Sequence, residues 1–165
     1  MHKLLVLPLM MVALLAGCGT PGSVTIPPDT TLIALRHTER EGELLSDAGH
    51  ARAAALPAAL AGVKIDAIYS PGLQRNLDTA APLAAERGIQ ITRIPPTGAA
   101  QRLLAQNAGK TVVWVGNKGN LNEIWTDLSA PGDPPLTYGE LFTLTRSPMG
   151  GVRVERGTFG VPPAK

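Results

Sequence analysis

An arginine and a histidine stand side by side at the end of an apolar segment. Residues 31–35 read Thr-Leu-Ile-Ala-Leu and lead directly into Arg36 and His37. A short, continuous apolar run of this kind is typical of a buried strand. In an open α/β sheet, ligands bind at the carboxyl ends of the strands, where these two side chains would lie. A histidine beside a fixed arginine is suited to attack on, or grip of, a phosphate group.

Two further loops carry groups that can bind an anion. One follows the apolar run 67–69 and contains Ser70, with Arg75 in the first turn of the helix expected next. The other, residues 116–119 (Gly-Asn-Lys-Gly), follows the apolar run 111–115. Parallel strands linked by helices place such loops on one edge of the sheet. Arginines, a histidine, free backbone amides and a helix N-terminus would then converge on a pocket suited to a tetrahedral dianion.

The elements that must position these groups follow from the apolar periodicity. Strands are expected at residues 31–35, 67–69, 89–94, 111–115, 141–145 and 152–155. Helices are expected at residues 46–61 and 73–87, around 103–104 and over 121–128. This alternation predicts an α/β fold with three layers, a mostly parallel sheet flanked by helices, and antiparallel strands at the C-terminal end.

Two of the expected helices contain a proline. Pro57 should kink or break the first, and Pro82 should bend the second. In the second helix, Leu73, Leu77 and the alanine pair 80–81 are expected to form the buried stripe.

The first 17 residues have the pattern of an export signal. A basic start is followed by an apolar run, residues 4–15, that is too short to span a bilayer as a helix. Residues 15–18, Leu-Ala-Gly-Cys, resemble the lipobox of bacterial lipoproteins, which implies cleavage before Cys18 and a lipid on that residue. Gly19 resembles the sorting pattern for the outer membrane, so the expected location is the bacterial cell envelope, periplasmic and lipid-anchored in a Gram-negative cell. The alternative is a buried N-terminal helix with a chance cysteine.

The rest of the chain is expected to form one domain. Residues 18–30 are interpreted as the lipidated Cys18 and a flexible tether, residues 31–157 as the domain, and residues 158–165 as a tail. Cys18 is the only cysteine, so no disulfide within the chain is expected. Nothing in the chain requires an oligomer, and a monomer is expected.

Composition and charge argue against several classes of partner. Without residues 1–17, 14 basic residues face 13 acidic ones, a net charge of +1. The absence of a basic run and the presence of only six aromatic residues argue against nucleic-acid binding. No cluster of His, Asp and Glu has the spacing of metal ligands, so no metal or other cofactor is expected.

The order of the blocks resembles the histidine phosphatase (phosphoglycerate-mutase-like) superfamily over residues 31–155. Residues 36–39, Arg-His-Thr-Glu, correspond to the family's Arg-His-Gly or Arg-His-Ala followed by Glu. Residues 45–49, Leu-Ser-Asp-Ala-Gly, match its Leu-Thr/Ser-x-x-Gly. Residues 69–80 match its Tyr-Ser-Ser-x-Leu-x-Arg-x-x-x-Thr-Ala at most positions. Residues 138–142, Tyr-Gly-Glu-Leu-Phe, resemble a strand of small, single-domain, secreted members.

The resemblance implies a role for each residue of the first two loops. His37 would be the nucleophile that forms a phosphohistidine, while Arg36 and Arg75 would hold the phosphate oxygens. The implied substrate is a phosphorylated small molecule or a phosphoprotein. A neutral imidazole attacks without help, and phosphoryl transfer depends chiefly on positioning and charge neutralisation.

The third loop departs from the family pattern. The family has Gly-His after its strand, whereas here Asn117 and then Lys118 follow Gly116. An asparagine amide donates a hydrogen bond but carries no positive charge. By analogy with oxyanion holes, losing such a donor costs about 10²–10³-fold in rate. Gly116, Asn117 and Lys118 are still expected to line the phosphate site, although the Lys118 side chain is expected to face solvent rather than restore the charge.

The leaving-group acid of larger family members is also missing, because no Asp or Glu lies between Glu86 and Glu123. Small members lack it too, so the absence favours leaving groups of low pKa, such as a phosphate or the imidazole of phosphohistidine. Glu39 and Arg40 are expected in a solvated loop or as a rim pair rather than as catalysts, with orientation of a substrate as the alternative role of Glu39. His50 is expected on the surface.

The favoured hypothesis is a phosphomonoesterase of the histidine phosphatase kind that acts through His37 and is weak or specialised. The alternative is a catalytically inactive envelope lipoprotein that binds a phosphorylated or anionic ligand, or a protein partner. A third possibility is a structural envelope protein that has kept only the fold.

Overall fold

Strands and helices alternate through residues 24–161, the part of the chain that the computed structural model describes. The strands are β1 (Thr31–Arg36), β2 (Arg40–Glu41), β3 (Leu44–Leu45), β4 (Ala67–Ser70), β5 (Ile91–Arg93), β6 (Thr111–Gly116), β7 (Glu140–Arg146) and β8 (Val152–Thr158). The helices are α1 (Asp47–Ala54), α2 (Leu56–Ala59), α3 (Gln74–Arg87), α4 (Ala99–Gln106) and α5 (Lys118–Leu128).

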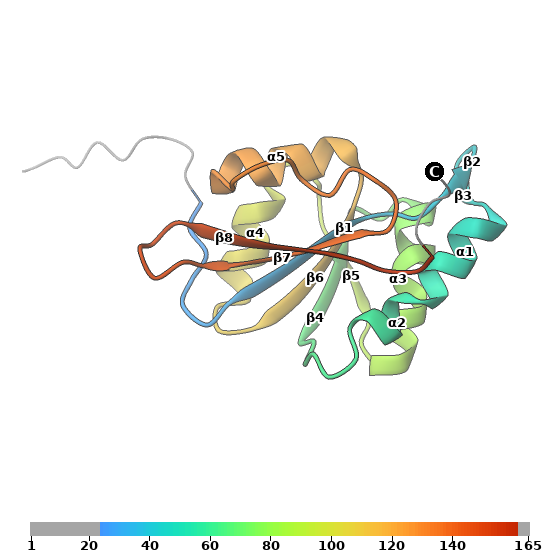
Figure 1. Cartoon of the computed structure of the whole chain (residues 1–165), viewed down its shortest axis with the longest axis horizontal. Coiled ribbons are helices and arrows are strands. Elements are labelled where there is room, and N and C mark those ends of the chain that lie inside the picture. Colours follow the sequence, from blue (N-terminus) through green and yellow to red (C-terminus); the bar gives the residue numbers. More distant parts are fainter. Residues whose placement is uncertain (1–23, 162–165) are drawn as a thin grey trace, which may run out of the picture.

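Six of the strands form one sheet in the order β5-β4-β6-β1-β7-β8 (Figure 1). Strands β5, β4, β6 and β1 are parallel, whereas β7 and β8 run antiparallel to their neighbours. Strands β2 and β3 form a separate two-stranded hairpin. The predicted α/β architecture, mostly parallel with antiparallel C-terminal strands, is confirmed.

Helices cover both faces of the sheet (Figure 1). Leu32 and Ala34 of β1 belong to the hydrophobic cluster shared with α4 and α5. Ile33 and Leu35 face the other way, into the cluster shared with α2 and α3. A strand that is buried on both faces reads as a continuous apolar run, which explains why β1 could be predicted from the sequence.

The first predicted helix is broken near Pro57, as expected. Ser46 caps α1, and its Oγ accepts a hydrogen bond of 3.2 Å from the amide of Gly49. The chain leaves the helix at Ala55, and α2 begins with Pro57 in its first turn, where a missing amide hydrogen is tolerated. The break lets α1 and α2 follow different directions over the same face of the sheet.

The buried stripe predicted for α3 is only partly confirmed. Ala80 is buried as predicted, but Leu73 precedes the helix and is 40% exposed, and Leu77 is half-buried. Asn76 and Thr79 are completely buried instead, together with Leu83. The Asn76 amide donates a hydrogen bond of 3.0 Å to the carbonyl oxygen of Val115. The Asn76 NH₂ and the Thr79 hydroxyl have hydrogen-bond partners inside the protein, which makes burial of these polar side chains possible.

The ends of the domain differ from the predicted boundaries. Within the predicted tether, residues 24–30 pack on the domain: Ile26 is buried beside α4 and α5, and the amide of Val24 donates to Asp127. Phe159, in the predicted tail, is 2% exposed and part of the core. Ile26 and Phe159 are single apolar residues within polar segments, so hydrophobic periodicity could not predict their burial. The predicted signal segment, residues 1–17, and Cys18 lie outside the described residues.

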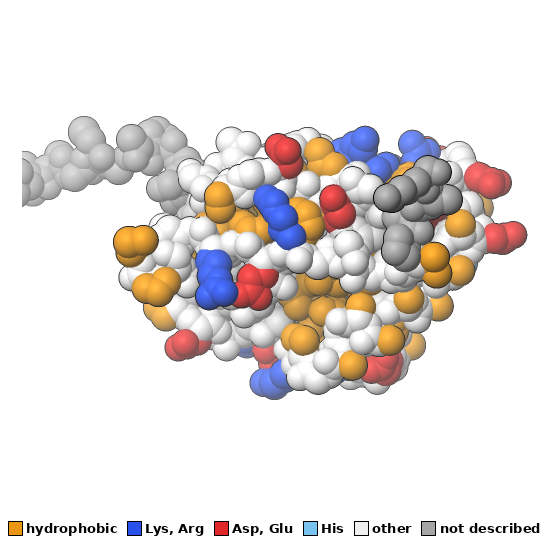
Figure 2. All heavy atoms as spheres, viewed as in Figure 1, with side chains coloured by type: hydrophobic (Ala, Val, Ile, Leu, Met, Phe, Trp, Pro, Cys, Tyr) orange, Lys and Arg blue, Asp and Glu red, His pale blue; other side chains and the backbone are white. Residues whose placement is uncertain are grey.

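The surface over β7 and β8 carries side chains of both charges (Figure 2). On the edge strand β8, Arg153 and Glu155 form an exposed ion pair of 2.8 Å. Charged side chains on an edge strand oppose pairing with another sheet. Among the helices of residues 24–161, none has the length and apolar character needed to cross a bilayer.

Candidate active site

The first and third predicted loops meet at the carboxyl ends of β1 and β6. Arg36 lies opposite Gly116 in the parallel ladder, and the amide of His37 donates to the carbonyl oxygen of Gly116 at 2.9 Å. A Cβ atom at Gly116 would lie 2.2 Å from Oδ1 of Asn120 and 2.4 Å from Nε1 of Trp114. Glycine is therefore required for β6 to pass this close to the helix that follows it.

His37 is buried, with 2% of its surface exposed. Its Nδ1 lies 2.8 Å from the carbonyl oxygen of Thr38, which can only accept, so Nδ1 carries the proton and Nε2 the lone pair. Burial, the largest cause, together with the charges of Arg36 and Arg75 lowers the pKa of His37 to about 4, despite the opposing hydrogen bond to Thr38. The imidazole is therefore neutral at pH 7, the form that a nucleophile requires.

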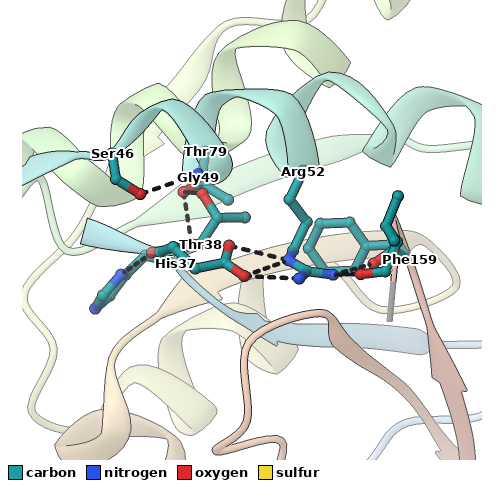
Figure 3. A network of polar contacts seen from close by, with 9 residues as sticks. His37, Thr38, Ser46, Gly49, Arg52, Thr79 and Phe159 are labelled. Atoms are coloured by element: carbon teal, nitrogen blue, oxygen red, sulfur yellow. Dashed lines mark hydrogen bonds and ion pairs between the residues drawn. The ribbon is translucent and has the colours of Figure 1, made fainter. Parts of the chain in front are cut away.

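The loop that follows His37 is anchored to α3 (Figure 3). The amide of Thr38 donates to Oγ1 of Thr79 at 3.0 Å, and the two hydroxyl oxygens are 3.2 Å apart. The Thr79 hydroxyl in turn donates to the carbonyl oxygen of Arg75 at 2.8 Å. One buried threonine thus fixes the position of the histidine relative to the helix that carries the second arginine.

Arg36 is held by the loop that leads into β7. Its Nη1 donates to the carbonyl oxygen of Leu136 at 2.9 Å, and its Nη2 donates to the hydroxyl of Tyr138 at 3.0 Å. The guanidinium also stacks 4.0 Å from the centre of the Tyr138 ring, which lies 5.8 Å from the imidazole of His37. Tyr138 is a site residue whose contact with Arg36 the sequence analysis did not predict.

Arg75 approaches the same site from α3. Its side chain is 14% exposed and forms an ion pair with Glu43, at the turn between β2 and β3. The Nε atoms of Arg36 and Arg75 are buried and have no hydrogen-bond partner among the described residues. Each guanidinium therefore keeps one N–H donor that no protein acceptor satisfies among the described residues.

Asn117 is the N-cap of α5. Its Oδ1 accepts hydrogen bonds from the amides of Gly119 at 3.1 Å and Asn120 at 3.3 Å. The Asn120 side chain accepts from the amide of Asn117 at 3.0 Å, which completes a capping box. Only the NH₂ of Asn117 remains to donate to a ligand. Lys118 is exposed, in agreement with the prediction.

Glu39 does not form the predicted solvated rim pair with Arg40. Its carboxylate binds the guanidinium of Arg52, which is 8% exposed, with N–O distances of 2.6, 2.9 and 3.0 Å (Figure 3). Although burial raises it, the hydrogen bonds from Arg52 hold the pKa of Glu39 below its usual value. Arg52 also donates to the carbonyl oxygens of Phe159 and Val161. Glu39 therefore ties the His37 loop to α1 and the C-terminal segment.

His50 is exposed on α1, as predicted. Ser70 is buried, and its Oγ accepts from the amide of Gly72 at 3.2 Å, so that it supports the turn before α3. Over residues 24–161 there is no group of three or more His, Cys, Asp and Glu residues that could hold a metal ion.

Comparison with known families gives a match over residues 33–96. The matching model is that of the histidine phosphatase superfamily, branch 1, so this part of the chain carries the sequence pattern of that superfamily. The segment contains His37 and Arg75 and ends before β6 and Asn117. No curated protein matches the chain by sequence.

Solved structures share the fold over nearly their whole length. YhfR of Bacillus stearothermophilus has a TM-score of 0.61 and 19% identity, over 76% of this chain and 95% of its own. The protein histidine phosphatase SixA, complexed with tungstate, has a TM-score of 0.60 and 14% identity, over 78% and 96%. A mycobacterial glucosyl-3-phosphoglycerate phosphatase with inorganic phosphate has a TM-score of 0.58 and 17% identity, over 79% and 97%. The chain thus has the small, single-domain fold of these proteins.

Proposed function

We propose that the chain belongs to the histidine phosphatase superfamily and is a phosphomonoesterase that works through a phosphohistidine at His37. The observation that carries this proposal is the state of His37 itself. A buried imidazole, kept neutral and oriented through Nδ1, lies beside two arginines with unused donors. The names of structurally similar proteins, two of them phosphatases captured with tungstate or phosphate, support the same reaction class.

The reaction follows from the arrangement of the donors. Nε2 of His37 attacks the phosphorus atom, the N–P bond forms, and the bond to the leaving-group oxygen breaks. Arg36 and Arg75 neutralise the charge on the remaining phosphoryl oxygens. Water then attacks the phosphorus of phosphohistidine, which releases inorganic phosphate and restores the neutral imidazole. The Thr38 carbonyl keeps Nδ1 protonated throughout, so that Nε2 remains the reacting atom.

Asn117 is the reason to expect slow turnover. Its NH₂ and the N-terminus of α5 can donate to a phosphoryl oxygen, but neither brings the full charge of an imidazolium. We therefore expect turnover about 10²–10³-fold below that of a site with a charged donor. The substrate is expected to have a leaving group of low pKa, because no acid between residues 86 and 123 is available to protonate it.

The experiment is hydrolysis of a panel of phosphate esters and phosphohistidine by the purified chain and by His37→Ala. Activity that disappears in His37→Ala supports the proposal. Activity that survives the substitution would overturn it, since His50, the other histidine of residues 24–161, is exposed on α1.

A non-catalytic binder is the second candidate, and the capping role of Asn117 favours it. An N-cap asparagine serves the helix whether or not the protein turns over a substrate. In that case tungstate would bind in an Arg36- and Arg75-dependent manner, with neither hydrolysis nor a phosphoenzyme.

A further inference from the structure

Arg75 is bound by a carboxylate of its own chain. Glu43, 32 residues earlier, contacts Nη1 of Arg75. The two partners differ sharply in environment, because the Arg75 side chain is 14% exposed and the Glu43 side chain is 80% exposed. The arginine is thus fixed in the protein, whereas the carboxylate reaches it from solvent.

The segment that carries Glu43 allows the carboxylate to leave. Glu43 follows Gly42 in the turn between β2 and β3, and Gly42 has a left-handed φ of 59° with no atom near its missing Cβ. On the far side of the turn, Leu45 is buried and keeps the hairpin on the domain. Rotation of the Glu43 side chain therefore frees Arg75 without displacing any buried group.

A phosphoryl group and the Glu43 carboxylate compete for the same donors. A guanidinium binds either anion through its outer N–H groups, so a ligand that takes the Nη1 hydrogen that Arg75 donates to Glu43 displaces that carboxylate. A short tether gives the carboxylate an effective concentration in the millimolar range. A free carboxylate has the same charge and the same acceptor atoms as Glu43, so it gains no stronger interaction with Arg75. A tetrahedral dianion brings a second charge and can contact Arg36 at the same time.

We infer that Glu43 is a specificity-determining residue, a tethered carboxylate on Arg75 that reserves the site for dianions able to displace it. The inference rests on the proposed function, because it requires Arg75 to bind the phosphoryl group. Glu43 lowers the affinity of the site for every anion, and the reduction is largest for carboxylates and other monoanions.

The test is calorimetric titration of the purified chain with tungstate near physiological salt, comparing Glu43→Gln with Glu41→Gln. Glu41 is the matched control, since it is exposed, lies on the same hairpin, and forms no ion pair with any residue in the described range 24–161. Both variants lose one negative charge, but only the first frees Arg75. An exposed pair contributes up to about 1 kcal/mol, so Glu43→Gln should bind tungstate about two- to fivefold more tightly than Glu41→Gln.

Two further measurements test whether Glu43 acts through Arg75 and by excluding other carboxylates. In the double variant Glu43→Gln/Arg75→Gln, the gain over Arg75→Gln alone should vanish, because the effect acts through that arginine. Added acetate should reduce tungstate affinity more in Glu43→Gln than in the parent, because the internal carboxylate no longer excludes it.

The outcomes separate this inference from the proposed function. Equal affinities in Glu43→Gln and Glu41→Gln, or weaker binding in Glu43→Gln, would overturn the role of Glu43 while tungstate binding that requires Arg75 still stands. Tungstate binding that is absent from every variant, or that survives loss of Arg36 and Arg75, would overturn both.

Discussion

At the scale of single residues, the chemistry of the site depends on how His37 and the arginines are surrounded. Burial keeps the imidazole neutral, the Thr38 carbonyl selects its tautomer, and the loop before β7 holds Arg36. The sequence predicted that Arg36 and His37 lie in the site because they directly follow an apolar run. It predicted the same for Arg75 because this residue lies in the first turn of the helix after the next strand. It could not predict Tyr138, which contacts Arg36 across 102 residues, or the pairing of Glu43 with Arg75 across 32. Those contacts exist only once the loops are folded together.

The depressed pKa of His37 predicts a pH dependence of stability. The unfolded chain takes up this proton near pH 6.5 and the folded chain only near pH 4, so the free energy of unfolding falls as pH drops through that window. Urea unfolding at pH 7 and pH 5 should show a larger loss of stability in the parent than in His37→Gln. His50→Gln, at an exposed site, should behave like the parent. The same loss in His37→Gln as in the parent would contradict the assignment.

Tyr138 should act on anion binding through Arg36. Tyr138→Phe removes the hydroxyl that accepts from Nη2 and keeps the stacked ring, so we expect tungstate affinity to fall about two- to tenfold, the worth of one hydrogen bond. Tyr69→Phe is the control, since its hydroxyl pairs with Asn107 in the core. Calorimetry should show weaker binding for the first variant alone. An equal effect of both would make Tyr138 merely structural.

At the scale of elements, the site is assembled by strand ends, helix caps and one buried threonine. The continuous apolar runs of β1 and β6 made their positions predictable, and the register between them sets His37 beside Gly116. The face of α3 was not predictable, because Asn76 and Thr79 are polar residues whose partners are distant backbone and side-chain groups. A polar side chain with a satisfied hydrogen bond is compatible with the core, and no hydrophobic pattern reveals it.

A substitution of Asn117 should change helix stability and the proposed catalysis in opposite directions. Asn117→His replaces a favourable N-cap, so the free energy of unfolding should fall by about 1 kcal/mol, while the added charged donor should raise kcat by up to about 10²-fold. Denaturant unfolding and phosphate release measure the two effects. Asn117→Asp keeps the cap and adds a negative charge, so it should retain stability and lose tungstate binding. A stable Asn117→His with unchanged turnover would contradict the account.

At the scale of the whole molecule, the candidate site lies at the carboxyl edge of the six-stranded sheet, and the C-terminal segment lies beside α1 (Figure 1). The predicted tether is shorter than the composition indicated, because Ile26 already belongs to the core. We propose that a lipid on Cys18, outside the described residues, holds this domain at the cell envelope.

Anchoring through Cys18 makes a prediction for the intact cell. Cys18→Ser should move the protein from the membrane fraction to the soluble fraction, because the lipid attaches to the thiol. Immunoblotting of the two fractions provides the measurement. Tungstate affinity of the domain should not change, which serves as the control for folding. A protein that stays in the membrane fraction after the substitution would count against lipidation at this residue.

The central claim is tested most directly by trapping the covalent intermediate. The chain is mixed briefly with a radiolabelled phosphate ester, quenched in alkali, where phosphohistidine survives, and digested to locate the label. The account predicts label on His37 in the parent, none in His37→Ala, and loss of the label during a chase with unlabelled substrate. Hydrolysis without any label on His37, or a label on another residue, would contradict it.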